Sequence, residues 1–135
     1  MSEAAIKPRR TRFVVRAYDL ARSLEFYRDQ LGLPVVHSWD RPDGAGHLLD
    51  AGGAIIELLG KTPGDVARGA WDFIMPVAKY DILLEVDSAQ AAYDAVKASG
   101  AVPTGPLETT SWGGVWFTVL DPDETPVVFL ETKSP

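Results

Sequence analysis

The first recognisable pattern in the chain is an alternation of apolar and polar residues over Arg12–Ala17. The apolar residues of one parity are Phe13, Val15 and Ala17. This period of two predicts a strand with one apolar face. The period then becomes helical, with apolar residues at Leu20, Leu24, Tyr27 and Leu31. Asp19 stands where it can cap this helix, and Gly32 stands where it can end it.

Three further strands are predicted before residue 60, because short apolar runs alternate there with turn residues. The predicted strands run from Leu33 to about Trp39, over His47–Ala51 and over Ala54–Leu59. The turns between them fall at Pro42–Gly46 and at Gly52-Gly53. The order of elements in this half of the chain is therefore βαβββ.

The same order of elements begins again near residue 80. Tyr80–Val86 alternates like a strand, and Asp87 opens a helix with Gln90 three positions on, as in a capping box. This helix ends at Gly100, has the same length as the first and is offset from it by 68 residues. A closing hairpin follows, with strands at Val115–Leu120 and Pro126–Glu131 and a turn at Asp121–Glu124. The two halves repeat a pattern rather than identical residues.

These elements predict a single α+β domain over residues 1–135, made of two βαβββ modules. Module one spans about 11–60, a linker spans about 61–79 and module two spans about 80–132. A chain of 135 residues is too short for two globules of ordinary size, so the modules must share one structure. Each sheet must bury one face against its own helix, which leaves its opposite face to line something else.

Composition narrows the classes of function. With 46% apolar and 24% charged residues, the chain is typical of a soluble globular protein, and no apolar run is long enough for a bilayer span. The net charge of −6 argues against nucleic acid or an anionic membrane as the main partner. The absence of cysteine excludes disulfides, thiolate metal sites and cysteine nucleophiles. The first residues contain no apolar stretch of the signal-peptide type, so the expected location is cytoplasmic.

Two segments resemble a known family. Phe13–Gly32, FVVRAYDLARSLEFYRDQLG, is similar to the opening strand and helix of vicinal oxygen chelate modules, which occur in glyoxalase-like and bleomycin-resistance-like proteins. Asp121–Pro126, DPDETP, resembles the turn before the last strand of such chains, except that Glu124 stands where the family usually has glycine. The resemblance covers roughly residues 10–132. It implies that the two modules form a curled mixed sheet around a cleft, with ligands on the concave face, and that two chains pair as a homodimer.

The metal-ligand positions of the family carry over to four residues of this chain, Arg12, Glu57, Asp81 and Val128. Arginine keeps its proton and valine has no donor atom, so only the two carboxylates are competent ligands. They do not make the His/Glu set that the family uses for divalent metals, and we expect neither a metal nor another cofactor. The resemblance favours a salt bridge between Arg12 and Glu57 over a catalytic role for these residues, while Asp81 is either a base or a charge in water.

Aromatic and polar residues are expected around the cleft. By analogy with fosfomycin-resistance members of the family, the parity of Trp112, Trp116 and Thr118 points into it. Two tryptophans there suit stacking on a planar ligand, although a given tryptophan is as often core filler or part of an interface. The other candidate ligand-binding residues are Arg12, Arg16, Trp39, His47 and Glu57. Strand parity assigns His47 to the cleft face and leaves the face of Trp39 open, and a lone histidine is more often structural than catalytic.

The leading hypothesis is a metal-independent protein that binds a small, planar, hydrophobic molecule and sequesters it, as bleomycin-resistance-like members do with an antibiotic. The acidic residues of the cleft favour a ligand that carries a cationic group or hydrogen-bond donors. The alternative is a lyase, isomerase or dioxygenase-like enzyme that uses Glu57 or Asp81 as a general base. A third option is a housekeeping protein that binds a common metabolite. The apolar run Trp71–Pro76 is expected to be shielded at the cleft mouth or in the homodimer interface.

Overall fold

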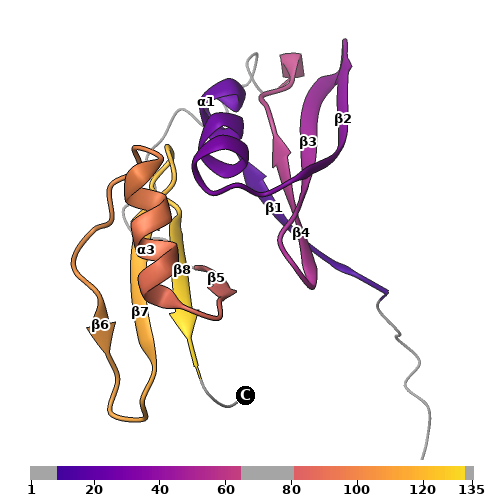
Figure 1. The fold of residues 1–135 in the computed structure, drawn as a ribbon. Helices are drawn as coiled ribbons and strands as arrows, with labels where there is room; N and C mark the ends of the chain where they lie inside the picture. Colours follow the sequence, from indigo (N-terminus) through magenta and orange to yellow (C-terminus); the bar gives the residue numbers. More distant parts are fainter. Residues whose placement is uncertain (1–8, 65–80, 133–135) are drawn as a thin grey trace, which may run out of the picture.

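The computed structural model describes residues 9–64 and 81–132, which form two βαβββ modules (Figure 1). The elements of module one are β1 (Thr11–Arg16), α1 (Leu20–Leu24), η1 (Glu25–Gln30), β2 (Val35–Arg41), β3 (Gly44–Asp50) and β4 (Ala54–Leu59). Those of module two are β5 (Ile82–Glu85), α3 (Ala89–Ala98), β6 (Glu108–Thr109), β7 (Val115–Leu120) and β8 (Pro126–Glu131). The predicted α+β class and the order of elements are confirmed.

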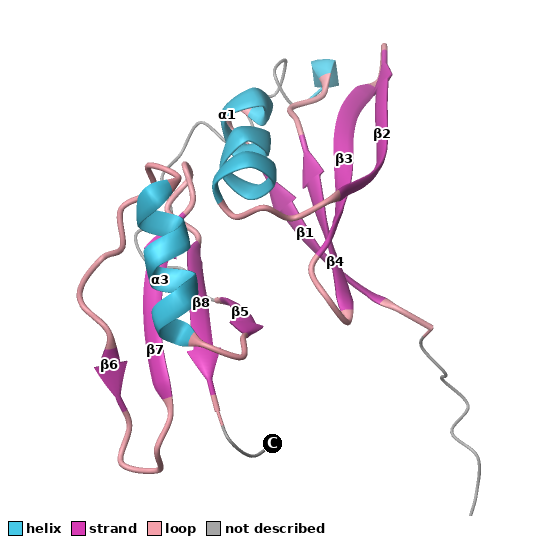
Figure 2. Ribbon diagram, in the orientation of Figure 1, coloured by secondary structure: helices cyan, strands magenta, loops and turns pink. Residues whose placement is uncertain are grey.

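Each module contains one mixed sheet, and the two sheets have equivalent topologies. The strand orders are β1-β4-β3-β2 and β5-β8-β7-β6. In each sheet the first strand pairs in parallel with the last, and the remaining neighbours are antiparallel. Over residues 9–64 and 81–132, no strand ladder joins one sheet to the other. The helix of each module lies over one side of its own sheet (Figure 2).

The first helix begins where the sequence predicts, but its second half is wound differently. The Asp19 side chain accepts a hydrogen bond from the Arg22 backbone N–H at 3.2 Å, which caps α1. From Glu25 the helix continues as the π-helix η1, and the Leu31 N–H donates to the Phe26 carbonyl at 2.9 Å. In this wide turn, Phe26 and Tyr27 are both buried.

The second helix starts one residue later than the sequence predicts. Its cap is Ser88, whose hydroxyl accepts a hydrogen bond from the Ala91 N–H at 3.0 Å. The predicted capping box from Asp87 to Gln90 is wrong, since the Gln90 amide donates instead to Asp94 at 3.0 Å. Serine is as good a cap as aspartate, so residue preference alone does not separate the two.

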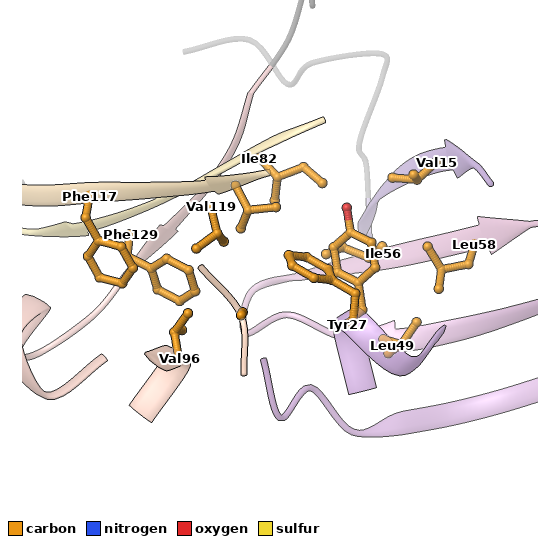
Figure 3. Packing of buried hydrophobic residues seen from close by; sticks show 13 residues of the cluster. Val15, Tyr27, Leu49, Ile56, Leu58, Ile82, Val96, Phe117, Val119 and Phe129 are labelled. Atoms are coloured by element: carbon orange, nitrogen blue, oxygen red, sulfur yellow. The ribbon is translucent and has the colours of Figure 1, made fainter. Parts of the chain in front are cut away.

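The core joins both modules through the helix-facing sides of their sheets (Figure 3). In module one, Leu49, Ile56 and Leu58 pack with Phe26 and Tyr27. Residues of module two in the same cluster include Ile82, Val96, Phe117, Val119, Val127 and Phe129. Phe117 stacks on Phe129 with ring centroids 4.8 Å apart. One cluster of buried apolar residues therefore contains residues of both modules.

Strand alternation leaves the other side of each sheet without a helix, and we call this side the open face. In module one the open-face residues are Arg12, Val14 and Arg16 on β1, Ile55, Glu57 and Leu59 on β4, Gly46 and Leu48 on β3, and His37, Trp39 and Arg41 on β2. In module two they are Leu83 and Glu85 on β5, Val128 and Leu130 on β8, and Trp116, Thr118 and Leu120 on β7.

A buried carboxylate links the last turn of module two to the helix of module one. Asp121 accepts hydrogen bonds from the Thr125 and Asp123 N–H groups at 2.8 Å each and from the Tyr27 hydroxyl at 2.9 Å. Burial raises the pKa of Asp121, against the effect of these three hydrogen bonds, and it also raises the pKa of Tyr27. Close to this contact, Asp123 accepts from the Tyr18 N–H at 3.0 Å. The turn contains Glu124 with φ of 67°, a left-handed conformation that explains why the family prefers glycine there.

The apolar segment Trp71–Pro76 lies outside the described residues. Within the described parts of the chain, the helices are too short and too polar to cross a bilayer.

The buried hydrogen bond leads to a stability prediction. Tyr27→Phe leaves the second oxygen of Asp121 without its donor in a buried place, and it should lower the free energy of unfolding by about 1–3 kcal/mol. Tyr93→Phe is the matched control, because the Tyr93 ring packs on Phe117 and its hydroxyl makes no hydrogen bond among the described residues. Urea denaturation of the three proteins measures both effects. Equal stability of the two variants would show that this link contributes little.

Candidate functional site

A row of four residues crosses the open face of module one near the ends of its strands. Arg16 pairs in register with Leu59, Leu59 with Gly46, and Gly46 with Trp39. The Trp39 indole lies against Gly46, where an added Cβ would collide with the ring. Glycine is therefore required at this position for the indole to lie against the sheet. The structure thus places Trp39, whose face the sequence leaves open, on the open face with Arg16.

The next residues on the same face form the expected salt bridge. The Arg12 guanidinium donates to Glu57 at 3.0 Å, with 43% of the Arg12 side chain and 17% of the Glu57 side chain exposed. The register partner of Glu57 on β1 is Val14, which follows Arg12 by two residues. The Arg12 and Glu57 side chains therefore meet diagonally across β1 and β4. The predicted Arg12–Glu57 pair is confirmed.

The equivalent positions of module two hold no such pair. Asp81 lies just before β5 and is exposed, and Val128 lies on the open face opposite Leu83. Arg12 and Asp81 each lie seven residues before the cap of their module's helix, Asp19 and Ser88. The corrected cap thus makes the two first strands equivalent position by position.

These four residues do not fit a divalent metal of the kind the family binds. One oxygen of Glu57 accepts from Arg12, and Val128 offers no donor atom. In the described ranges, no three His, Cys, Asp or Glu side chains gather as a metal site would need. We therefore derive no chemical step through a metal.

Module two contributes an aromatic part of the open face. Trp116 and Thr118 lie on β7 with their neighbours Leu130 and Val128 on β8, and each is partly buried. Trp112 lies in the turn between β6 and β7, with its ring against Gly114 and 62% of its surface exposed. Trp116 and Thr118 are thus wall residues of this sheet, and Trp112 lies at its rim.

The face predicted for His47 is wrong. In the structure His47 pairs with Leu58, a core residue, and its Nδ1 forms a hydrogen bond of 2.8 Å with the Ser38 hydroxyl. Burial lowers the pKa of His47, and the positive charge of Arg28 on η1 lowers it further. The histidine on the open face is instead His37, whose ring stacks on Trp39 with centroids 5.9 Å apart.

A pocket of about 290 Å³ lies at the end of the Arg16–Trp39 row. Its polar lining comes from Arg16, Arg41, Asp43 and Thr62, and its apolar lining includes Trp39 and Leu59. The volume is slightly below the range of about 300–1,000 Å³ that is usual for small-molecule sites, so the pocket suits one part of a ligand. The sequence analysis missed Arg41, Asp43 and Thr62. Arg41 lies two residues after Trp39 and therefore on the same face of the strand. This spacing would predict Arg41 as a site residue only if the face of Trp39 were known.

Comparison with known proteins places the chain in a family. The model of the glyoxalase/bleomycin resistance protein/dioxygenase superfamily matches residues 9–129. The chain belongs to this superfamily. A curated relative, the lactoylglutathione lyase of Haemophilus influenzae, is 31% identical over 132 residues, which cover 90% of each chain.

Solved structures of similar fold include proteins of different names. UcmS2 matches with a TM-score of 0.76 and 14% identity, covering 94% of this chain and 100% of its own. TnmS3, an antibiotic binding protein from Streptomyces sp. CB03234, matches with a TM-score of 0.70 and 21% identity, covering 97% of this chain and 100% of its own. At these identities the likeness shows the fold alone.

The composition of the site leads to a prediction about metal. Protein purified without chelator should contain no stoichiometric iron, zinc, nickel or manganese, and EDTA should leave its thermal midpoint unchanged, because the four positions supply no competent ligand set. Elemental analysis and thermal scans with and without EDTA measure this. About one such ion per chain, with a lower thermal midpoint after chelation, would show that the protein holds a structural metal and would contradict this prediction.

Proposed function

We propose that this protein is a metal-independent binding protein that holds a planar, hydrophobic small molecule against its open faces and sequesters it, as an antibiotic-resistance protein does. The observation that carries the proposal is the Arg12–Glu57 ion pair at 3.0 Å, which occupies two of the four positions where the family binds metal. Because these positions cannot hold a metal, they cannot supply Lewis-acid catalysis, and we assign the open faces a role in ligand binding.

The apolar character of the open faces supports a hydrophobic ligand. Val14, Leu83 and Leu120 are 46%, 51% and 44% exposed, although each is a large apolar side chain in or beside a sheet. A single exposed apolar residue is ordinary, but these share the register-defined open faces with Trp39 and Trp116. An indole from each module gives flat surfaces on which a planar ligand can stack.

The comparisons support a binding protein, and they also support an enzyme of the same fold. The antibiotic binding protein TnmS3 has the same fold, and its likeness makes a binding role reasonable for this chain. The second candidate function is an enzyme of the lyase, isomerase or dioxygenase type, and the 31% identity to a lactoylglutathione lyase favours it. In that case Glu57 or Asp81 would act as a general base. Homodimer formation and a cytoplasmic location stay predictions of the sequence.

The binding role leads to a mutational prediction. For the strongest binder found in a screen of planar aromatic compounds, Trp116→Ala and Trp39→Ala should each weaken binding about tenfold or more, since stacking and apolar burial are lost together. Trp112→Ala should have a smaller effect because Trp112 lies at the rim and is largely exposed. Phe13→Ala is the control, since it removes a partly exposed aromatic side chain from the helix-facing parity of β1.

Isothermal titration calorimetry is the suitable measurement, because it does not depend on the fluorescence of the replaced tryptophans. Parent-like affinity in both Trp116→Ala and Trp39→Ala would reject the open faces as the ligand wall. A screen in which no planar compound binds would reject the proposed function itself.

A further inference from the structure

The pocket beside Trp39 differs in charge from the rest of the molecule. The chain carries a net charge of −6, yet the charged residues that line this pocket are Arg16, Arg41 and a single carboxylate, Asp43. The pocket therefore has an excess of positive charge on a protein that is otherwise acidic. The acidic residues in the sequence predict a ligand with a cationic group or hydrogen-bond donors, whereas the charge of this pocket favours an anion.

In the part of the chain that the structure describes, both pocket arginines lack a partner for the guanidinium group. Over residues 9–64 and 81–132, neither Arg16 nor Arg41 has a hydrogen bond or an ion pair from its guanidinium group. Arg12, on the same strand and face as Arg16, donates to Glu57 at 3.0 Å. Arg28 is likewise paired, with Asp29. The guanidinium groups of the pocket are thus available to a ligand, whereas that of Arg12 is already occupied.

The position of the pocket brings these charges close to a stacking surface. Arg16 is the last residue of β1 and Arg41 the last residue of β2, at the end of the sheet where β4 also stops. Trp39 lies two residues before Arg41 on the same face, with its indole in contact with Gly46 and its ring stacked with that of His37. Trp39 and both arginines line the same pocket, so a planar ligand on the Trp39 indole would lie near guanidinium groups, which bind carboxylates through paired N–H donors.

We propose that the ligand is an aromatic anion, with its ring on Trp39 and a carboxylate or similar acidic group held by Arg16 and Arg41. This inference rests on the proposed function and specifies the class of molecule bound at the same site. Asp43, at the rim, repels the acid and limits its affinity. The Arg12–Glu57 pair is neutral overall, so it does not oppose the ligand charge from the neighbouring row.

A matched pair of planar probes tests the proposal. 2-Naphthoate and 2-naphthamide have the same ring system and nearly the same shape, but only the former is charged at pH 7. The parent protein should bind 2-naphthoate about tenfold or more tightly than 2-naphthamide, because hydrogen bonds to charged groups are stronger than those between neutral groups. This preference should decrease as salt is added, since the pocket is open to solvent.

Four variants locate the preference. Arg16→Gln and Arg41→Gln should each remove most of the preference for the acid while leaving the affinity for the amide nearly unchanged. Arg22→Gln is the matched control, because it makes the same charge change on the exposed surface of α1 and should preserve the preference. Asp43→Asn should act in the opposite direction and strengthen binding of the acid.

The outcomes separate this inference from the proposed function. Equal affinities of the parent for the two probes would overturn the anionic ligand and leave a planar-ligand binding protein standing. A preference for the acid that survives in both Arg16→Gln and Arg41→Gln would overturn its assignment to this pocket. Failure of both probes to bind, together with failure of the wider planar screen, would overturn the proposed function and with it this inference.

Discussion

One buried carboxylate links the two halves of this molecule by a hydrogen bond. Asp121 closes the last turn of module two through two backbone N–H groups and accepts the hydroxyl hydrogen of Tyr27 from module one. Tyr27 lies in the π-helix η1, where it is buried beside Phe26. A carboxylate with only 3% of its surface exposed is stable only when its oxygens have donors, so the turn and the helix constrain each other. This contact and the shared apolar cluster together join the two modules.

The proposed function depends on the Arg12–Glu57 ion pair, whose contribution to stability is small. Because Arg12 is 43% exposed, the pair is expected to contribute at most about 1 kcal/mol. Its consequence is local: it neutralises the carboxylate that would be one metal ligand of the family. The charged side chains that line the pocket beside Trp39 are Arg16, Arg41 and Asp43, and in the described residues neither arginine has a partner for its guanidinium group. This is the sheet on which we propose that an aromatic acid binds.

The sequence predicts the elements of this fold well and the faces of its strands less well. Asp19 and the apolar period after it locate the first helix, and the Asp121 turn locates the last hairpin, because caps and turns are set by neighbouring residues. The sequence predicts the wrong face for His47 because alternation alone does not say which residues of a strand face the core. A shift of one residue exchanges the two faces. The register resolves this, because Leu48 pairs with Glu57 on the open face and His47 pairs with the core residue Leu58. Arg41 was missed for the same reason, and the choice of Ser88 over Asp87 as a cap depends on backbone geometry that residue preference does not encode.

The most direct test of the account measures binding and turnover together in the parent and in Glu57→Gln. This substitution preserves the size of the side chain and removes its charge and its capacity as a base. Each protein would be titrated with the strongest planar ligand and assayed for lactoylglutathione lyase activity, with and without added zinc or nickel. The account predicts no turnover in either protein under any of these conditions and only a modest change in ligand affinity. Turnover in the parent that Glu57→Gln abolishes, with ligand binding retained, would contradict it and establish the enzyme in its place.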